Sequence, residues 1–387
     1  MSLPGPVLHV VTRLEAGGVP LSLLPLLEGL HERGLEVELA TGLTEPPARD
    51  MLDAARTLDI PLHVVPSLVR DPHPLKDLTA LFTLRRIMLR GGHRVVHTHT
   101  SKGGFIGRLA GVLAGVPVRV YSPHGTILEG YFTGWKRRLF TALERRAARW
   151  THAIVGLTPE ESRSYLEAGI GEPSQHVQIP VSIDPAPYRS PPEERRQEGR
   201  RKRGIGEDEV VIVNVGRLVP VKDQATLLHA LALLPGGLDW SCWFIGDGPD
   251  RDVLETLSEQ LGVGGRVRFL GHREDVPDLL PLADIFALTS VNEGFGRVIL
   301  EAFAAHLAVI ATRVGGVPTV VEEGRAGMLV PPKDPEALAA RLRDLIRDRE
   351  ARERLVREGE HLLDRYSRER VVSDHIALYR RLSDERA

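Results

Sequence analysis

Two acidic residues, Glu293 and Glu301, lie on either side of a glycine-bracketed turn in the last third of the chain. Residues 283–289 are a short apolar run of strand type, and apolar residues within 298–304 recur at helical spacing. The sequence therefore predicts a strand, a turn at 294–296 and a helix. Such a turn directs backbone N–H groups and the positive end of the helix at one point, which suits a phosphate. The alternative is an ordinary strand–helix unit with solvated acids.

A pair of cations, Arg217 and Lys222, lies in a second predicted turn, after the strand expected at residues 210–215. A diphosphate leaving group needs positive charge that is held in place before the bond breaks. Arginine offers a bidentate fork for this purpose and lysine a point charge. The position at a strand end, directly after Gly216, favours this interpretation over two solvated surface cations.

A glycine pair, Gly17 and Gly18, opens an early helix after the strand predicted at residues 7–11. Glycine lets a phosphate approach backbone N–H groups closely, although an ordinary turn would use the same residues. The pattern Gly-x-Gly-x-x-Gly is absent from this first strand–helix turn. A dinucleotide-dependent dehydrogenase is therefore disfavoured.

Two histidines, His97 and His99, have the spacing of a metal-binding pair. A zinc site needs further ligands, and no Cys, His or carboxylate lies nearby in the sequence at ligand spacing. The sequence therefore predicts no metal site. Another histidine, His124, precedes Gly125 at the end of the strand predicted at residues 118–121.

Length and composition indicate a globular protein of two domains. A chain of 387 residues is too long for one ordinary hydrophobic core. Its contents of 42% hydrophobic and 26% charged residues are typical of soluble proteins. A net charge of −2 gives no overall attraction to nucleic acid. Cys242 is the only cysteine, so no intrachain disulfide can form. Because no apolar run reaches the roughly 18 residues that span a bilayer, we expect a cytoplasmic protein, peripheral to a membrane at most.

Strands alternate with helices in both halves of the chain, which predicts an α/β fold of two doubly wound parallel sheets. Five prolines within residues 180–192 and the charged run 193–203 mark the boundary. We therefore expect domains at 1–185 and 205–365, a linker at 186–204 with few packing contacts, one polar helix over 336–366 and a final amphipathic helix. Ligands bind outside the carboxyl ends of parallel strands, where Gly17, the 97–102 segment and His124 are all expected. The cleft between the domains is the predicted site.

An arginine-rich helix is predicted from Tyr131 to Trp150, with aromatic residues between its cations. Cations and aromatic side chains together suit a membrane surface, where arginine meets lipid phosphate and tryptophan lies at the interface. A helix with one core face and one solvated face explains the pattern equally well. A single basic helix in a neutral chain gives little support to nucleic-acid binding.

Together these motifs resemble those of the retaining glycosyltransferases of family 4, which have the GT-B fold and include bacterial capsule and exopolysaccharide transferases. The resemblance covers nearly the whole chain, and the set of motifs is specific although no single member is. The matching stretches are Gly17-Gly18, residues 97–110, Pro123-His124-Gly125, Gly216-Arg217-Leu218 with Lys222, Gly246-Asp247-Gly248, and Glu293 to Glu301. Residues 97–110 look most like the subgroup that builds lipid-linked oligosaccharides and polysaccharides.

The resemblance implies two Rossmann-like domains, with the acceptor bound by the first and a nucleotide-sugar by the second. The last helix, residues 366–387, would cross back to the first domain. The donor diphosphate would be neutralised by Arg217 and Lys222, the ribose held by Glu301, and the β-phosphate approached by Gly18. The donor sugar would be held by Glu293 with the backbone of Gly294, Phe295 and Gly296, and His124 would lie over it. The remaining implied donor-binding positions are Arg297, Val298, Leu270 to Arg273 beside the base, and Gly17 beside Gly18.

The resemblance also implies a chemistry without a cofactor or a divalent metal. Such enzymes retain the anomeric configuration without an agreed protein nucleophile, and a front-face transfer is the usual proposal. We expect a UDP-sugar donor and a saccharide or polyprenyl-linked acceptor at the inner face of the membrane. The alternatives are a nucleotide-sugar epimerase or hydrolase of the same fold, and a non-catalytic nucleotide or polyanion binder.

Overall fold

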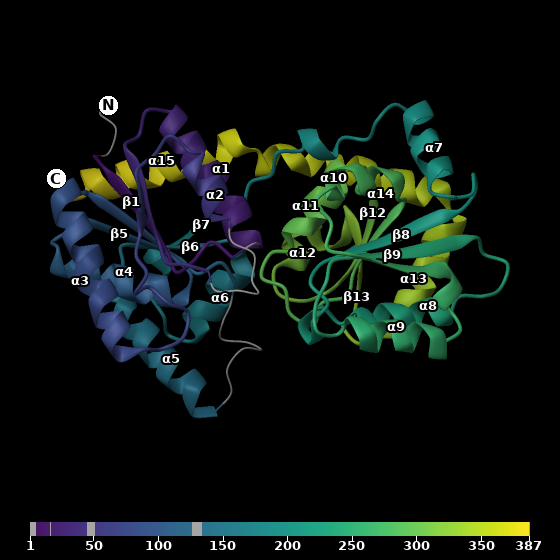
Figure 1. Cartoon of the computed structure of the whole chain (residues 1–387), viewed down its shortest axis with the longest axis horizontal. Coiled ribbons are helices and arrows are strands. Elements are labelled where there is room, and N and C mark those ends of the chain that lie inside the picture. Colours follow the sequence, from purple (N-terminus) through teal and green to yellow (C-terminus); the bar gives the residue numbers. More distant parts are fainter. Residues whose placement is uncertain (1–4, 16, 45–50, 126–133, 387) are drawn as a thin grey trace. The chain divides into compact units, whose positions relative to one another are not determined.

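The structure is a computed structural model that describes residues 5–15, 17–44, 51–125 and 134–386, without the side chain of Lys136. The chain forms two compact units, Met1–Ser182 with Tyr366–Ala387, and Ile183–Arg365. Each unit contains a parallel sheet covered by helices on both faces (Figure 1). Two parallel α/β domains confirm the predicted fold class.

The first unit is built on a seven-stranded sheet of order β3-β2-β1-β4-β5-β6-β7. The strand order reverses direction at β1, which pairs with β2 on one side and with β4 on the other. The strands are β1 (Val7–Val11), β2 (Val37–Thr41), β3 (Leu62–Val64), β4 (Val95–His99), β5 (Val118–Ser122), β6 (Ala153–Gly156) and β7 (His176–Gln178). Ligands gather at such a switch point, outside the carboxyl ends of the strands.

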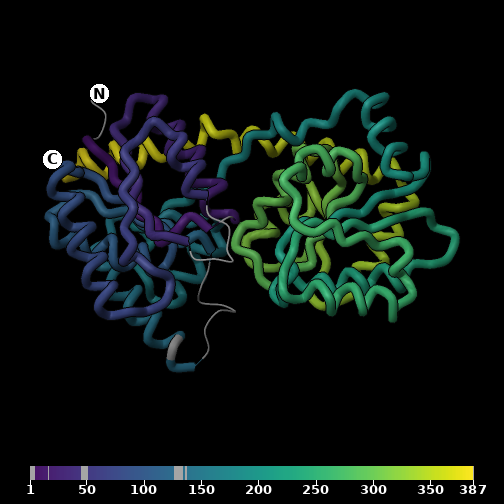
Figure 2. Tube along the Cα trace, viewed as in Figure 1, coloured from purple at the N-terminus to yellow at the C-terminus, as the bar shows by residue number. Residues whose placement is uncertain are grey.

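The helices of the first unit pack on both faces because strand side chains alternate between the faces. Val7, Val95 and Val118 pack with α1 and α15, whereas Leu8, Val10 and Val96 pack with α3 and α4. Figure 2 shows the yellow C-terminal helix running beside the purple α1. The helices are α1 (Gly18–Glu32), α2 (Leu52–Arg56), α3 (Pro74–Gly91), α4 (Ser101–Leu113), α5 (Gly134–Ala148), α6 (Pro159–Glu167) and α15 (Arg368–Asp384).

The second unit repeats this plan with a six-stranded sheet of order β10-β9-β8-β11-β12-β13. Its switch point lies at β8, which pairs with β9 and with β11. The strands are β8 (Val210–Val215), β9 (Trp240–Ile245), β10 (Val267–Gly271), β11 (Ile285–Leu288), β12 (Ala308–Thr312) and β13 (Gly327–Val330).

Helices α8, α9 and α13 cover one face of this second sheet, and α10 and α11 lie toward the other (Figure 1). Helix α14 contacts α11, α13 and β12. Their bounds are α7 (Glu193–Lys202), α8 (Gln224–Ala232), α9 (Arg251–Gln260), α10 (Val276–Leu279), α11 (Arg297–Ala304), α12 (Val317–Val320), α13 (Pro335–Arg347) and α14 (Arg349–Leu362). Short 3₁₀ turns are η1 (Pro173–Gln175), η2 (Ala186–Tyr188), η3 (Pro220–Lys222), η4 (Gly264–Arg266), η5 (Leu280–Leu282), η6 (Glu322–Gly324) and η7 (Leu363–Tyr366).

The segment expected to be a linker with few packing contacts is instead a packed part of the second unit. Residues 193–202 form α7, and the guanidinium of Arg200 is buried against the sheet. Both Arg196 and Arg200 pair with Asp284, at 2.7 and 3.0 Å. The sequence prediction was wrong here because a dense run of charges can fold when a single acid binds several of its cations.

The single polar helix predicted over 336–366 is also wrong. It is two helices, α13 and α14, which separate at Asp348. Asp348 has an extended backbone, and its side chain accepts a hydrogen bond from the N–H of Ala351, as an N-cap residue does. None of the helices in the described ranges is long and apolar enough to cross a membrane.

Candidate functional site

The loops after β8 and β11 bring Lys222 and Glu293 together at the switch point of the second sheet. The ammonium group of Lys222 forms an ion pair with the Glu293 carboxylate, and both side chains are partly buried, with 23% and 17% exposure. The hydroxyl of Ser290 donates a second hydrogen bond to the same carboxylate at 3.2 Å. The sequence placed both residues in turns at strand ends, and the structure joins those turns into one site.

Backbone contacts hold these two loops against each other. The N–H of Val291 donates to the carbonyl of Val221 at 2.9 Å, and the hydroxyl of Thr289 donates to the carbonyl of Lys222 at 3.1 Å. A third loop closes over Glu293, since the N–H of Gly316 donates to its carbonyl at 3.1 Å. The ion pair is therefore positioned by main-chain hydrogen bonds and not only by two flexible side chains.

The turn at 294–296 ends in a left-handed residue and opens α11. Gly296 has a φ of 77°, which favours glycine, and the preceding Phe295 is buried. Helix α11 begins with Arg297, followed by Val298, so the N-terminus of the helix lies directly after the turn. The predicted strand, glycine turn and helix are all present in this order.

Within α11, Glu301 is buried and carries an ion pair with Arg297 one turn earlier. Tyr188 lies beside these two side chains: burial and then the charge of Glu301 raise the pKa of its hydroxyl to about 12, and the charge of Arg297 opposes this shift. Burial raises the pKa of the Glu301 carboxyl, and the charge of Arg297 opposes this shift. Tyr188 comes from the segment interpreted as a linker, so sequence reasoning missed it, and no local pattern would have indicated it.

The other predicted donor-binding residues of the second unit are less constrained. Arg217 is exposed in the loop after β8, and its carbonyl accepts a hydrogen bond from Gln224 at 3.0 Å. Leu270 lies in β10 at the sheet edge, and Arg273 follows it with its guanidinium paired to Asp275. Arg217 thus shares a loop with Lys222, whereas Leu270 lies in, and Arg273 follows, a strand two positions from β8.

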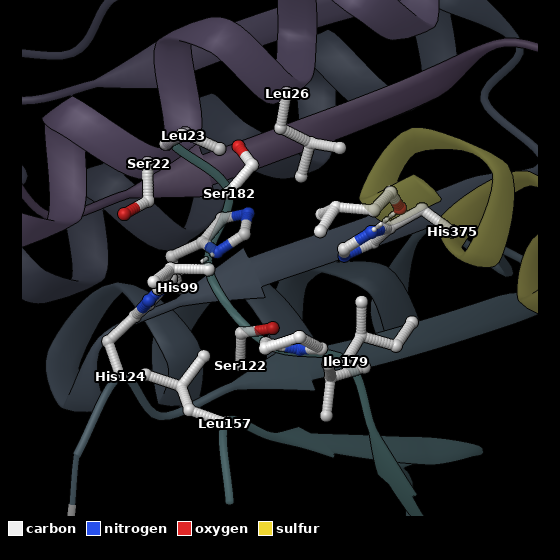
Figure 3. Close-up of a pocket in the computed structure, with 14 residues that line it drawn as sticks. Ser22, Leu23, Leu26, His99, Ser122, His124, Leu157, Ile179, Ser182 and His375 are labelled. Carbon is white, nitrogen blue, oxygen red and sulfur yellow. Dashed lines mark hydrogen bonds between the residues drawn. The ribbon is translucent and has the colours of Figure 1, made fainter. Parts of the chain in front are cut away.

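The first unit presents a second group of predicted residues at the carboxyl ends of its strands. Gly17 is the N-cap of α1, Gly18 is its first residue, and Ser22 donates to the carbonyl of Gly18 at 2.8 Å. Ser22 and His124 line one small cavity of about 30 Å³, with His99 and His375 on its other sides (Figure 3). The first turn of α1 and the loop after β5 therefore converge on one place.

His124 itself has a strained backbone and a partly buried ring. Its φ is 60°, in the left-handed region that non-glycine residues rarely adopt, and the next N–H, of Gly125, donates to Glu161 at 2.7 Å. Burial, with a smaller contribution from His375, lowers the pKa of His124 to about 4. At neutral pH the ring is therefore uncharged, so it acts through hydrogen bonds and not as a cation.

His97 and His99 do not lie in a loop, as the sequence suggested, but within β4. A third histidine, which is not near His97 and His99 in the sequence, is His9 of β1, and it pairs in register with His97. One nitrogen from each of these three buried rings lies within 4.8 Å of the others. Only the parallel pairing of β1 with β4 reveals this group, because the two strands are far apart in the sequence.

The chain has two doubly wound parallel sheets, and polar side chains lie near the switch point of each. This arrangement defines the GT-B class of glycosyltransferase fold. Residues 17–182 match the model of the glycosyl transferase 4-like domain, and residues 195–362 match that of the glycosyl transferases group 1. The chain belongs to this glycosyltransferase family and is an enzyme of that class. The resemblance to glycosyltransferases of the GT-B fold that was inferred from the motifs is confirmed.

Similar proteins include two bacterial enzymes whose lengths match that of the chain. The putative glycosyltransferase EpsD of Bacillus subtilis is 29% identical over 348 residues, covering 87% of this chain and 86% of the relative. The UDP-Gal:alpha-D-GlcNAc-diphosphoundecaprenol alpha-1,3-galactosyltransferase of Escherichia coli is 28% identical over 325 residues, covering 80% and 82%.

Solved structures show the same fold. HepE of Anabaena, in complex with UDP-glucose, has a TM-score of 0.80 at 24% identity and covers 98% of this chain and 99% of its own. WaaG, a glycosyltransferase involved in lipopolysaccharide biosynthesis, has a TM-score of 0.74 at 21% identity and covers 97% and 99%. The GT-B architecture extends over nearly the entire chain.

Proposed function

We propose that this enzyme is a retaining family 4 glycosyltransferase that moves a sugar from a UDP-sugar to a lipid-linked saccharide or a polysaccharide. Relatives support this assignment: one is named for a UDP-galactose donor and a diphosphoundecaprenol-linked acceptor, and a structural neighbour was solved with UDP-glucose. The observation that carries it is the ion pair of Lys222 and Glu293, held by the backbone at the switch point.

This ion pair suits a diphosphate leaving group because it keeps a cation in place before the donor binds. When the donor enters, the diphosphate takes over Lys222, and Glu293 becomes available to accept a hydrogen bond from a sugar hydroxyl. The exposed Arg217 of the same loop adds a bidentate contact. Charge that develops on the leaving group then meets preorganised donors, each of which contributes roughly 10²–10³ in rate.

The turn and helix after β11 hold the rest of the donor. The backbone of Gly294, Phe295 and Gly296 contacts the sugar, and the N-terminus of α11 faces the diphosphate, with Arg297 and Val298 beside it. Glu301, whose carboxylate is already held by Arg297, accepts the ribose hydroxyls. Leu270 to Arg273 borders the base.

In the first unit, Gly18 with the adjacent Gly17 lets the donor phosphate approach the start of α1, and His124 contacts the sugar through a neutral ring. The transfer uses neither a cofactor nor a divalent metal, because cationic side chains and backbone N–H groups neutralise the diphosphate. Transfer rates that are unchanged by EDTA are the expected outcome, and loss of activity that magnesium restores would contradict it.

The decisive experiment measures transfer by Arg217→Ala and Lys222→Ala against a matched control, Lys202→Ala. Lys202 lies in the same unit, but its surface pair with Glu198 is away from the switch point. Both site variants should lose transfer while thermal unfolding stays unchanged, and the control should keep its activity. Wild-type rates in both site variants would refute the proposal, and sugar release without an acceptor would favour a hydrolase or epimerase.

We also propose that α5 attaches the enzyme to the inner face of the membrane. The predicted helix began at Tyr131, which lies outside the described residues. The outer face of α5 exposes Trp135 (69%), Leu139 (52%) and Leu143 (41%) at a spacing of one helical turn. The same helix also exposes Arg137 and Arg138, and exposed cations together with exposed apolar residues suit an anionic lipid surface.

Not every residue of the predicted membrane helix belongs to this surface. Glu144 is buried in an ion pair with Arg108 at 2.7 Å, and Trp150 packs against Phe105 with ring centroids 6.3 Å apart. Changing Arg137 and Arg138 to Glu should reduce co-sedimentation with anionic liposomes, whereas Arg349→Glu, on the exposed α14, should not. Unchanged liposome binding would leave α5 as a solvated helix face.

A further inference from the structure

A row of buried polar side chains crosses the face of the first sheet that α1 and α15 cover. His9 of β1, His97 and His99 of β4, and Ser122 of β5 all point to this face because strand side chains alternate. Each is at most 3% exposed. Burying a polar group costs free energy unless the group is hydrogen-bonded. The hydrogen-bond partners of these side chains therefore determine their role.

The first part of the row joins the sheet to the C-terminal helix. The hydroxyl of Ser122 is hydrogen-bonded to Nε2 of His97 at 2.7 Å, and Nδ1 of the same ring to the hydroxyl of Tyr379 at 2.6 Å. Tyr379 belongs to α15 and is fully buried. Its hydroxyl also meets Nε2 of His9 at 3.4 Å, the longest contact of the series.

The second part of the row leads from His9 to the predicted sugar-binding residue. Nδ1 of His9 is hydrogen-bonded to Nε2 of His99 at 3.0 Å. Nδ1 of His99 is in turn hydrogen-bonded to Nε2 of His124 at 2.8 Å. One unbranched chain of hydrogen bonds therefore runs from Ser122 through Tyr379 to His124, which lines the cavity shown in Figure 3 together with His99 and Ser122.

The rings in this chain are neutral at physiological pH. Burial lowers the pKa of His9 to about 3 and that of His124 to about 4, and it lowers the pKa of His97 and His99 well below the ordinary range. The neighbouring His375, at the edge of the group, also has its pKa lowered to about 4 by burial. A neutral imidazole carries one N–H, so each ring donates through one nitrogen and accepts through the other.

This restriction couples the tautomers of all four rings. If Ser122 donates to His97, each ring then accepts through Nε2 and donates through Nδ1, as far as His124. If His124 donates to His99, the order reverses, and each ring carries its proton on Nε2. A mixture of the two tautomers places two donors or two acceptors face to face where ring meets ring. At Tyr379 it leaves either the hydroxyl proton or one ring nitrogen without a partner, so a buried group is unsatisfied in each case.

We propose that Tyr379 is a positioning residue that fixes the tautomer of His124 through the two histidines between them, His9 and His99. The proposal rests on the proposed function only in its last step, in which the nitrogen of His124 outside the chain faces the donor sugar. In one orientation that nitrogen donates a hydrogen bond, and in the other it accepts one. Helix α15, which follows the second unit in the sequence, thus controls what His124 offers to the sugar.

A metal ion on His9, His97 and His99 is the alternative use of the same side chains. The stacked rings of His97 and His99, with centroids 4.4 Å apart, and the 2.8–3.0 Å spacing of nitrogens along the chain fit ring-to-ring hydrogen bonds. In addition, Tyr379 and Ser122 already occupy both nitrogens of His97. Metal analysis of protein purified without chelators should find substoichiometric zinc, and one zinc per chain would overturn the proposal.

The direct test is long-range ¹H–¹⁵N NMR of protein labelled with ¹⁵N-histidine, which reports the tautomer of each ring. In the wild type, His9, His97, His99 and His124 should all share one tautomer. His375 is an internal reference, because its Nδ1 donates to the carbonyl of Val371 at 2.8 Å and fixes its tautomer independently. Differing tautomers within the four rings would refute the chain, and this result needs no variant.

The variant Tyr379→Phe removes one hydroxyl and cuts the chain between His97 and His9. We expect His9, His99 and His124 to populate a second tautomer, and kcat for sugar transfer to fall roughly twofold or more, in proportion to the fraction with the wrong tautomer. The affinity for UDP should stay unchanged. The control Tyr165→Phe also deletes a fully buried hydroxyl of the first unit, outside the chain, and should leave the tautomers as they are.

The two proposals fail in different ways. If the wild type transfers no sugar but its four rings share one tautomer, the chain stands and the proposed function falls. If transfer is normal and Tyr379→Phe leaves both the tautomers and kcat unchanged, the positioning role of Tyr379 is wrong.

Discussion

The two units of this glycosyltransferase use ionisable side chains in opposite ways at equivalent places in their sheets. Around β1 in the first unit, histidines with 0–1% exposure are neutral and hydrogen-bonded to one another. Around β8 in the second unit, Lys222 and Glu293, at 23% and 17% exposure, form an ion pair. Full burial selects neutral groups, whereas partial burial tolerates charges that are paired.

This difference agrees with what each unit is proposed to bind. The charged pair of the second unit can exchange its internal partner for the charges of a diphosphate. A neutral ring such as His124 offers a hydrogen bond to a sugar hydroxyl without attracting competing anions. The comparison leads to three predictions, in order of decreasing effect.

The largest expected effect is selective acid sensitivity of the first unit. For His9, His97, His99, His124 and His375 the folded-state pKa is lowered, so below pH 6.5 the unfolded chain binds protons that the folded unit does not. The stability that these rings contribute is complete above pH 6.5 and is lost as the pH falls toward 4. Each ring adds a slope of up to about 1.4 kcal/mol per pH unit.

Two carboxyl groups have shifts of the opposite sign. Burial raises the pKa of Glu161 in the first unit to about 7 and raises that of Glu301 in the second. Their contribution is present at low pH and is lost as the pH rises through the folded-state pKa. In the first unit, acid removes the stabilising contribution of five rings, whereas it strengthens that of Glu161 alone, so the net effect of acid is destabilising. Hydrogen exchange between pH 7.5 and 5 should therefore show β1, β4 and α15 losing protection before β8 and β11. The reverse order would contradict the contrast between the units.

The second effect concerns the ion pair. Glu293→Gln keeps the size of the side chain but removes the charge that pairs with Lys222, and we expect transfer to fall by roughly 10². The matched control is Glu323→Gln, which breaks the exposed pair with Arg313. Steady-state rates should separate the two variants, and equal rates would mean that the pair is only structural.

The smallest effect concerns the glycine at the start of α1. A Cβ built on Gly18 meets no heavy atom within 4 Å, so the fold itself does not require glycine there. Gly18→Ala should therefore leave the unfolding temperature unchanged, but it should weaken donor binding about tenfold, or 1.4 kcal/mol, by obstructing the phosphate. Gly265→Ala, at an equally open position of the second unit, is the control. Unchanged donor binding in Gly18→Ala would show that no phosphate approaches α1.

The features that depend on local sequence patterns were predicted correctly. The alternating strands and helices, the turns with Lys222 and Glu293, and the glycine at 296 follow from hydrophobic period and turn chemistry within short windows. Tertiary pairing decided the rest. His9 meets His99 across 90 positions, and Tyr379 meets His97 across 282, so the histidine chain exists only once strand register and the packing of α15 are known.

The same reason explains the error at the domain boundary. Helix α7 has almost no apolar residues, so its composition favours a solvated segment, yet Arg196 and Arg200 bind Asp284 some eighty positions later. Tyr188, just before this helix, reaches Glu301 in the same way. Charged and aromatic side chains whose partners lie far along the chain cannot be assigned from local sequence.

The central claim is that the cation of Lys222 binds the diphosphate of the donor. Isothermal titration of UDP and of uridine into the wild type and Lys222→Ala tests it most directly, because the two ligands differ only in the diphosphate. The account predicts that the substitution weakens UDP binding tenfold or more, about 1.4 kcal/mol, and leaves uridine binding unchanged. Equal UDP affinity in both proteins would contradict it.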